Sequence, residues 1–145
     1  MTEIREIKRF NRFYLRMIGL FSMYTDQSAY TTNEAMILFE IHSREGECTA
    51  SILSNYFLLD KGHISRLLKK FEKKNLLTKI ISKKDRRIQY LKLTPKGLQD
   101  LNRLMKQADE IVAGMIQDVE QNELHEMIQA MKRIESILNK TRKRG

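Results

Sequence analysis

The sequence contains few residues that interrupt helices or cross-link a chain. Its 145 residues include one proline and six glycines, so few positions break the backbone and long helices are expected. Cys48 is the single cysteine and has no partner for an internal disulfide. A chain without disulfides fits a reducing compartment. We therefore expect a cytoplasmic protein whose fold depends on packing.

Several functional classes lack their sequence signals. No apolar run approaches the ~20 residues that span a bilayer, and the first residues show no signal-peptide pattern. Glycine-rich phosphate loops and nucleophile elbows are also missing. The three histidines, His42, His63 and His125, are far apart and lack metal-ligand spacing. We therefore expect no membrane partner, no enzyme activity, no cofactor and no metal site.

Positive charge is concentrated in one part of the chain. The net charge is +9, and residues 60–96 hold thirteen Lys and Arg against three Asp and Glu. In the rest of the chain, the numbers of positive and negative side chains are therefore nearly equal. A basic excess confined to one segment indicates a surface for a polyanion such as nucleic acid. A solvated basic face is the alternative interpretation.

The first half of the chain predicts a series of helices. Apolar residues recur at three- and four-residue steps over 3–24, which predicts a long helix. Thr31 and Glu34 have the spacing of a capping box that opens a second helix. We expect Gly46 to end that helix in a left-handed conformation. Thr49 can then cap a shorter helix over 50–57.

Asp60 marks the start of the most informative segment. It is suited to cap a helix from Lys61, so two short helices are joined by a tight turn, as in a helix-turn-helix. One face of this second helix is polar and basic, whereas the other is apolar. The apolar stripe consists of Ile64, Leu67, Leu68 and Phe71.

Two short β-like runs and two more helices follow. The runs 76–82 and 88–93 are separated by a basic loop, which predicts a hairpin. Thr94 and Pro95 then open a helix, because a missing N–H costs nothing in the first turn. The remaining periodicity predicts helices over about 95–117 and 121–142. The predicted fold is mainly α with a small β-hairpin (α+β).

The pattern from Thr31 to Gly97 resembles the MarR family of bacterial winged-helix transcriptional regulators. The most specific parts are Lys84-Asp-Arg-Arg87 and Leu93-Thr-Pro-Lys-Gly97. Two residues depart from the family pattern: Asn75 replaces a usual glycine, and Lys79 lies near a usual arginine. Matching segments are Thr31–Phe39, Thr49–Leu53, Leu59–Leu68 and Glu72–Leu77, besides those two motifs.

The resemblance implies a winged helix-turn-helix over 30–96, flanked by helical dimerisation regions over 1–29 and 97–145. It implies a homodimer that binds a pseudo-palindromic operator in double-stranded DNA. We expect a repressor that a small-molecule effector releases. The apolar stripes of the flanking helices alone also fit an intramolecular bundle. A winged helix used for protein–protein or RNA binding, without operator specificity, is the alternative function.

Specific residues are expected to contact DNA. The helix from Lys61 should enter a major groove, where Ser65 and Arg66 are placed to contact bases or adjacent phosphates. Arginines of the hairpin loop, the wing, suit a narrow minor groove, and Asp85 is expected to pair with one of them. The predicted DNA-binding residues are Lys61, Gly62, His63, Ser65, Arg66, Lys69, Lys84, Asp85, Arg86 and Arg87.

An effector pocket is expected where the dimerisation helices meet the winged core, as the resemblance implies. Arg16 could meet an anionic ligand, and the aromatic residues could meet an aromatic one. The alternative is that these residues are ordinary core. Candidate pocket residues are Phe13, Arg16, Met17, Phe21, Met36, Phe39 and His42.

Cys48 invites a redox hypothesis, because a lone reactive cysteine can act as a sensor. It lies beside the predicted cap Thr49, away from the N-terminal helix in which thiol-sensing members of the family carry theirs. An ordinary, partly buried cysteine is the favoured interpretation.

Overall fold

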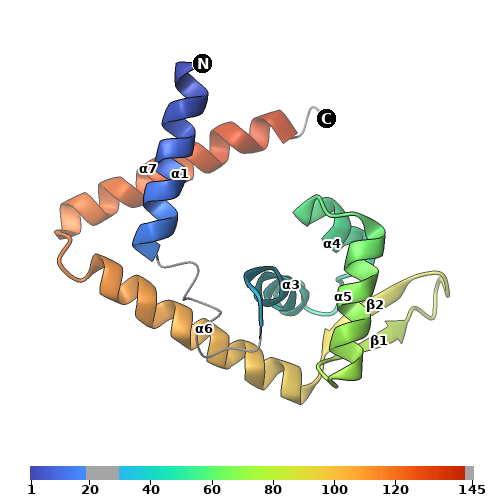
Figure 1. Cartoon of the computed structure of the whole chain (residues 1–145). Coiled ribbons are helices and arrows are strands. Elements are labelled where there is room, and N and C mark those ends of the chain that lie inside the picture. The colour runs from blue at the N-terminus through green and yellow to red at the C-terminus, as the bar shows by residue number, and fades with distance from the viewer. Residues whose placement is uncertain (19–29, 143–145) are drawn as a thin grey trace. The chain divides into compact units, whose positions relative to one another are not determined.

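The computed structural model covers the whole chain, and residues 1–18 and 30–142 are described below. As the sequence predicts, this part is mainly helical with one two-stranded antiparallel hairpin (Figure 1). Two compact units, 1–111 and 112–145, divide it within α6. The elements are α1 (Thr2–Ile18), α3 (Thr32–Ser43), α4 (Ala50–Phe57), α5 (Lys61–Lys73), β1 (Leu77–Ile81), β2 (Gln89–Leu93), α6 (Pro95–Ile116) and α7 (Gln121–Arg142).

The predicted capping box opens α3. Thr31 Oγ1 accepts a hydrogen bond from the Glu34 amide at 3.2 Å, and Glu34 Oε1 accepts one from the Thr31 amide at 2.9 Å. These bonds satisfy two of the amides that a helix start leaves unpaired. The helix ends at Ser43, with Arg44 as its C-cap. Gly46 is left-handed as expected, with a φ of 85°, but the left-handed turn begins one residue earlier, at Glu45, which has a φ of 51°.

Helices α4 and α5 form the predicted helix-turn-helix. Thr49 Oγ1 accepts from the Ile52 amide at 3.2 Å, and an Asp60 oxygen accepts from the His63 amide at 2.7 Å. Between the helices, Leu58 adopts a left-handed conformation with a φ of 55°. The stripe of α5 supplies the core as predicted, because Ile64, Leu68 and Phe71 are fully buried while Leu67 is half-buried.

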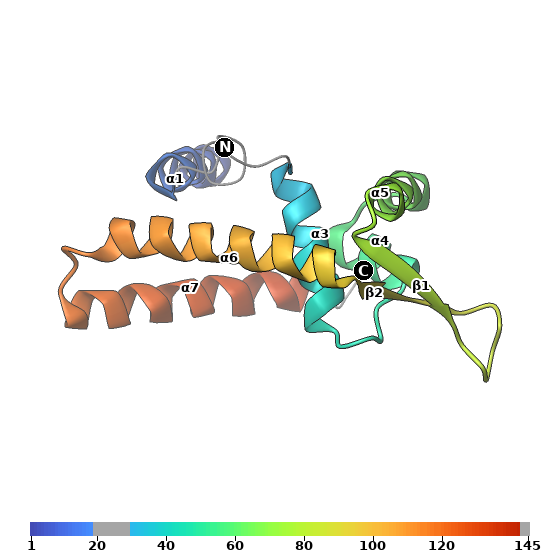
Figure 2. The ribbon, with the colours of Figure 1, turned by 90° about the horizontal axis from the view of Figure 1, so that it is seen from below.

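The hairpin pairs β1 with β2, in a register that matches Leu77 with Leu93 and Ile81 with Gln89. Leu91 is the buried residue of β2, and its amide donates to the Cys48 carbonyl at 2.8 Å. This bond fixes the hairpin base to the segment before α4. The loop at the other end projects beyond α3, α4 and α5 (Figure 2).

A compact junction joins the end of α5 to the start of α6. Asn75 adopts a left-handed conformation with a φ of 59°, a role that glycine usually fills. Thr94 Oγ1 donates to the Asn75 carbonyl at 2.6 Å and accepts from the Gly97 amide at 3.0 Å. A Cβ on Gly97 would lie 2.2 Å from the Leu76 carbonyl oxygen. The Thr-Pro-Lys-Gly motif therefore holds the start of α6 against the turn that follows α5.

Helices outside the winged core leave apolar side chains exposed. Helix α1 has no buried residue, and Ile7 is 61% exposed. In the second unit, Leu138 of α7 is 58% exposed. The helix predicted over 3–24 is described only to Ile18, so its C-terminal part and the predicted connection after it lie outside the described residues. No described helix is both long and apolar enough to cross a membrane.

Candidate DNA-binding surface

The outer face of α5 carries an unbroken basic stripe. Because its members recur at three- and four-residue steps, they share one side of the helix. A shallow groove follows them, and among the described residues no acidic side chain lines it. The lining residues are Arg66, Lys69, Lys70, Lys73 and Lys74.

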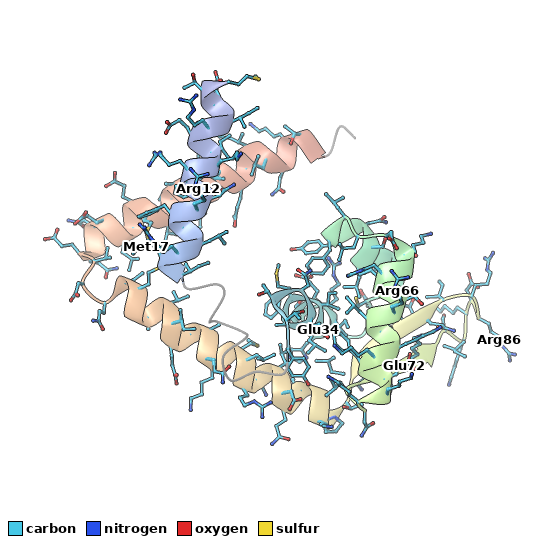
Figure 3. All side chains as sticks on the ribbon, viewed as in Figure 1. Arg12, Met17, Glu34, Arg66, Glu72 and Arg86 are labelled. Carbon is cyan, nitrogen blue, oxygen red and sulfur yellow. The ribbon has the colours of Figure 1, made fainter. Side chains whose placement is uncertain are left out.

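The first two turns of α5 present the residues predicted to read DNA. Lys61, Gly62, Ser65, Arg66 and Lys69 are exposed, and His63 is half-buried. Figure 3 shows Arg66 on α5. This face is available to a major groove.

Gly62 makes room for the Arg66 side chain. A Cβ on Gly62 would lie 3.2 Å from Arg66 Nη1 and 3.2 Å from Asp60 Oδ1. The hydrogen bond from the His63 amide, followed by the positive charge of Arg66, lowers the pKa of Asp60. Asp60 therefore both caps α5 and attracts the positively charged side chain of Arg66.

Two lysines of the stripe already interact with groups of the winged core. Lys70 Nζ lies 2.8 Å from Glu34 Oε2 of α3, and Lys74 Nζ lies 5.8 Å from the ring centroid of Tyr30. From the sequence, Glu34 is expected only as part of the capping box. Its contact with Lys70 joins residues far apart in the chain, and no local pattern signals it.

The wing brings together Asp85 and Arg87. Arg87 Nε and Nη2 each lie 3.0 Å from an Asp85 oxygen, and the Arg87 amide donates to the same carboxylate at 3.0 Å. These bonds lower the pKa of Asp85. The structure thus forms the aspartate–arginine pair that was expected, and its partner is Arg87.

Arg86 differs from its neighbour. It is exposed near the end of the hairpin loop (Figure 3), and it forms no ion pair with any residue that the structure describes. Lys84 is also exposed there. Arg86 and Lys84 therefore present positive charge that no carboxylate in residues 1–18 or 30–142 neutralises through an ion pair.

A cavity of about 380 Å³ lies between α3, α4 and α6 in the first unit. It is mainly apolar, and the charged side chains that line it in the described part of the chain are the acids Glu40 and Asp109. The cavity itself therefore offers no cation to an anionic ligand. Its lining residues are Ala35, Met36, Phe39, Glu40, Tyr56, Phe57, Leu101, Leu104, Met105, Ala108 and Asp109.

The candidate effector residues separate into groups. Met36 and Phe39 line the cavity, whereas His42 is exposed on α3 and is not a lining residue. Phe13, Arg16 and Met17 belong to α1 and do not line it, and the Arg16 guanidinium lies 5.9 Å from the Phe13 ring centroid. Phe21 lies outside the described residues. Tyr56 and Met105 were not predicted, because only the folded chain brings α4 and α6 to α3.

Cys48 is fully buried, and burial raises the pKa of its thiol to about 11. The thiol is therefore neutral at physiological pH and poorly reactive. Within residues 1–18 and 30–142, no group of three or more His, Cys, Asp or Glu side chains could hold a metal ion.

Comparison with known proteins agrees with this geometry. Residues 31–97 match the family model of a winged helix DNA-binding domain. No curated protein sequence matches the chain significantly. Similar solved structures include Streptococcus pneumoniae FabT in complex with DNA, at 18% identity and a TM-score of 0.76, covering 97% of this chain and 98% of that one.

Two further structures have the same fold. Escherichia coli MarR in its apo form is 18% identical with a TM-score of 0.69, and 90% of this chain and 94% of that chain are covered. Bordetella bronchiseptica BpsR is 17% identical with a TM-score of 0.69, covering 88% and 91%. This chain therefore shares its fold with these solved structures. The chain therefore contains a winged helix DNA-binding domain and has the fold of the MarR-type regulators, which confirms the resemblance found in its sequence.

Proposed function

We propose that this protein is a transcriptional regulator that binds a pseudo-palindromic operator as a homodimer. The observation that carries the proposal is the exposed basic face of α5 beside a projecting basic wing. A helix and a hairpin in this arrangement can reach a major groove and the neighbouring minor groove. Streptococcus pneumoniae FabT, which shares the fold, is in complex with DNA in its structure.

The residues divide into three groups by their expected contacts. Ser65 and Arg66 read base edges, and Arg66 can bind a guanine with two hydrogen bonds. Wing residue Arg86 enters the minor groove, with Arg87 beside it and held by Asp85. Further contacts to phosphates or adjacent bases come from Lys61, Gly62, His63, Lys69 and Lys84.

Dimerisation explains the exposed apolar faces of the outer helices. Ile7 of α1 and Leu138 of α7 lose contact with water when a second copy covers them. A dimer also gives two recognition helices at a fixed separation, and this separation sets the spacing of the two operator halves. Regions 1–29 and 97–145 are the proposed dimerisation regions.

A small, mainly apolar molecule is the proposed effector. The cavity has the size of a small-ligand site and includes aromatic residues from α3 and α4. DNA binding by Bordetella bronchiseptica BpsR is regulated by 6-hydroxynicotinic acid, which makes small aromatic compounds the first to test. Neutral ones come before acids, because the charged residues that line the cavity are Glu40 and Asp109. A ligand that binds better to a conformation unable to fit the operator would shift the population and relieve repression.

A gel shift with the DNA upstream of the protein's own gene tests the proposal. Labelled upstream DNA is titrated with protein in the presence of unlabelled unrelated DNA. We expect a discrete complex that survives the competitor and weakens steeply as salt rises. Equal competition by unrelated DNA would reject operator specificity. Tighter binding to RNA of the same sequence would favour the RNA-binding alternative.

Bacterial origin and cytoplasmic location remain predictions.

A further inference from the structure

Glu34 is a carboxylate in a position where charge is costly. Its side chain is 3% exposed, and one oxygen serves the capping box while the other faces Lys70. Burial alone favours the neutral acid, but the contact with Lys70 and the bond from the Thr31 amide outweigh it. The pKa of Glu34 therefore lies below its ordinary value. Glu34 is thus charged at neutral pH.

Lys70 is the cation that compensates Glu34. Its Nζ lies 2.8 Å from Glu34 Oε2, and its side chain is 48% exposed. Oε2 accepts no hydrogen bond of standard geometry from any described residue, so Lys70 is the group that compensates its charge. In Figure 3, Glu34 lies between α3 and α5. The ion pair therefore connects the middle of α5, the proposed recognition helix, to the start of α3.

The ends of α5 are already fixed by other contacts. Asp60 caps the N-terminus, and the Leu76 amide at the C-terminal turn donates to the Phe71 carbonyl at 2.9 Å. Neither contact is a lateral tie to α3. The Glu34–Lys70 pair supplies one, about one turn beyond Ser65 and Arg66. Together with the buried residues Ile64, Leu68 and Phe71, it can fix the rotation of α5 about its own axis.

We propose that the Glu34–Lys70 ion pair positions the recognition helix, and that Lys70 is a positioning residue rather than a phosphate contact. The inference rests on the proposed DNA-binding function. The pair holds α5 so that Ser65 and Arg66 face outward together. The exposed basic stripe conceals this role, because Lys70 lies among lysines that are free to meet phosphates.

Glu34 is buried although Lys70 is half-exposed, so the behaviour of buried ion pairs suggests how to separate positioning from stability. Removing one partner of such a pair is destabilising, because the other charge is left uncompensated. Replacing both partners with neutral groups of similar shape is often nearly neutral. Glu34→Gln retains the capping box, since glutamine also serves there. Lys70→Met retains the aliphatic stem of lysine.

The experiment compares four full-length variants with the unaltered protein: K70M, E34Q, the double variant E34Q/K70M, and K73M as control. Lys73 is exposed on the same helix and forms no ion pair with a described residue. Urea unfolding without DNA reports stability. Affinity is measured over a range of salt for a duplex selected by the unaltered protein from a random library, and for an unrelated duplex of equal length.

We expect K70M to lower the urea midpoint and E34Q/K70M to recover most of that loss. The double variant has the net charge of the unaltered protein, so its affinity for unrelated DNA and its salt dependence should be unchanged. Its preference for the selected duplex should fall about tenfold, the effect of losing roughly one base contact. K73M should retain both the urea midpoint and the preference.

Other results would overturn the proposal. If E34Q/K70M keeps the full preference, the pair does not position the helix. If K70M lowers affinity for both duplexes equally and reduces the magnitude of the salt slope by about one, Lys70 contacts a phosphate. If the unaltered protein selects no duplex, the proposed DNA-binding function fails and the positioning role fails with it, although the unfolding data would still measure the coupling of the pair.

Discussion

Two neighbouring arginines of the wing, Arg86 and Arg87, have different surroundings although their side chains are the same. Arg87 is held by Asp85 through three hydrogen bonds, whereas Arg86 extends without an ion-pair partner in the described chain. The guanidinium of Arg87 is thus ordered before DNA arrives. An ordered side chain loses less conformational entropy on binding. Arg86 instead has its full charge available to the minor groove.

The first prediction concerns these wing residues. Arg87→Ala should weaken operator binding by tenfold or more, about 1.4 kcal/mol. Asp85→Asn should also weaken it, even though it removes a negative charge, because the arginine loses its support. Fluorescence anisotropy at moderate salt measures both. Unchanged affinity for Arg87→Ala would remove the wing from the proposed interface, and tighter binding by Asp85→Asn would show that net charge dominates.

The second prediction concerns Gly62, whose missing side chain leaves space for Arg66. Gly62→Ala should stabilise the protein by less than the roughly 0.5–1 kcal/mol that alanine's helix preference would give, because the new Cβ would lie 3.2 Å from Asp60 Oδ1, which caps the helix. It should also displace the Arg66 guanidinium and reduce preference for the selected duplex. Thermal unfolding and competition binding measure the two effects. Gly114→Ala, where a Cβ meets nothing within 4 Å, is the control that should stabilise α6 without affecting DNA binding.

The third prediction concerns Cys48. Because its thiol pKa is raised to about 11, the thiolate is scarce at pH 7 and its fraction increases as pH rises toward that value. Alkylation by iodoacetamide should be slow at pH 7 and should accelerate in urea, which exposes the thiol. Mass spectrometry follows the reaction. Rapid modification of the folded protein, or loss of DNA binding after peroxide treatment, would reinstate a sensing role.

At the scale of elements, local signals predicted most of the structure. The helix caps could be predicted because capping depends on residues only a few positions away. These caps are Thr31, Thr49, Asp60 and Thr94. Asn75, which replaces a usual glycine, adopts the left-handed conformation that glycine favours. The ion pair between Glu34 and Lys70 was not predicted, because only the folded chain brings together these residues, which are distant in sequence. Tyr56 and Met105 were missed as cavity residues for the same reason.

The fourth prediction tests the junction between α5 and α6. Gly97→Ala places a Cβ against the backbone of Leu76, where nothing flexible can move away. It should destabilise the protein by about 3 kcal/mol. Gly114→Ala is the matched substitution on the same helix and should be mildly stabilising. Urea unfolding compares them, and equal midpoints would show that the junction tolerates a side chain.

For the whole molecule, the fifth prediction is that stability depends on protein concentration. The exposed apolar faces of α1 and α7 should be covered by a second copy, and association stabilises the folded state by mass action. The melting temperature should therefore rise as the concentration is increased from micromolar levels. Sedimentation equilibrium should give the mass of a dimer. A monomer with a constant melting temperature would favour the intramolecular bundle.

Helix α3 carries both the cavity residues Met36 and Phe39 and the carboxylate that faces Lys70. If a ligand in the cavity shifts α3, the two sites share a coupling free energy, and thermodynamic linkage makes that coupling reciprocal. Whatever factor a ligand removes from DNA affinity, DNA must remove from ligand affinity. Operator DNA is then itself an antagonist of the effector, so the regulator would sense its ligand less well while bound at a promoter than while free.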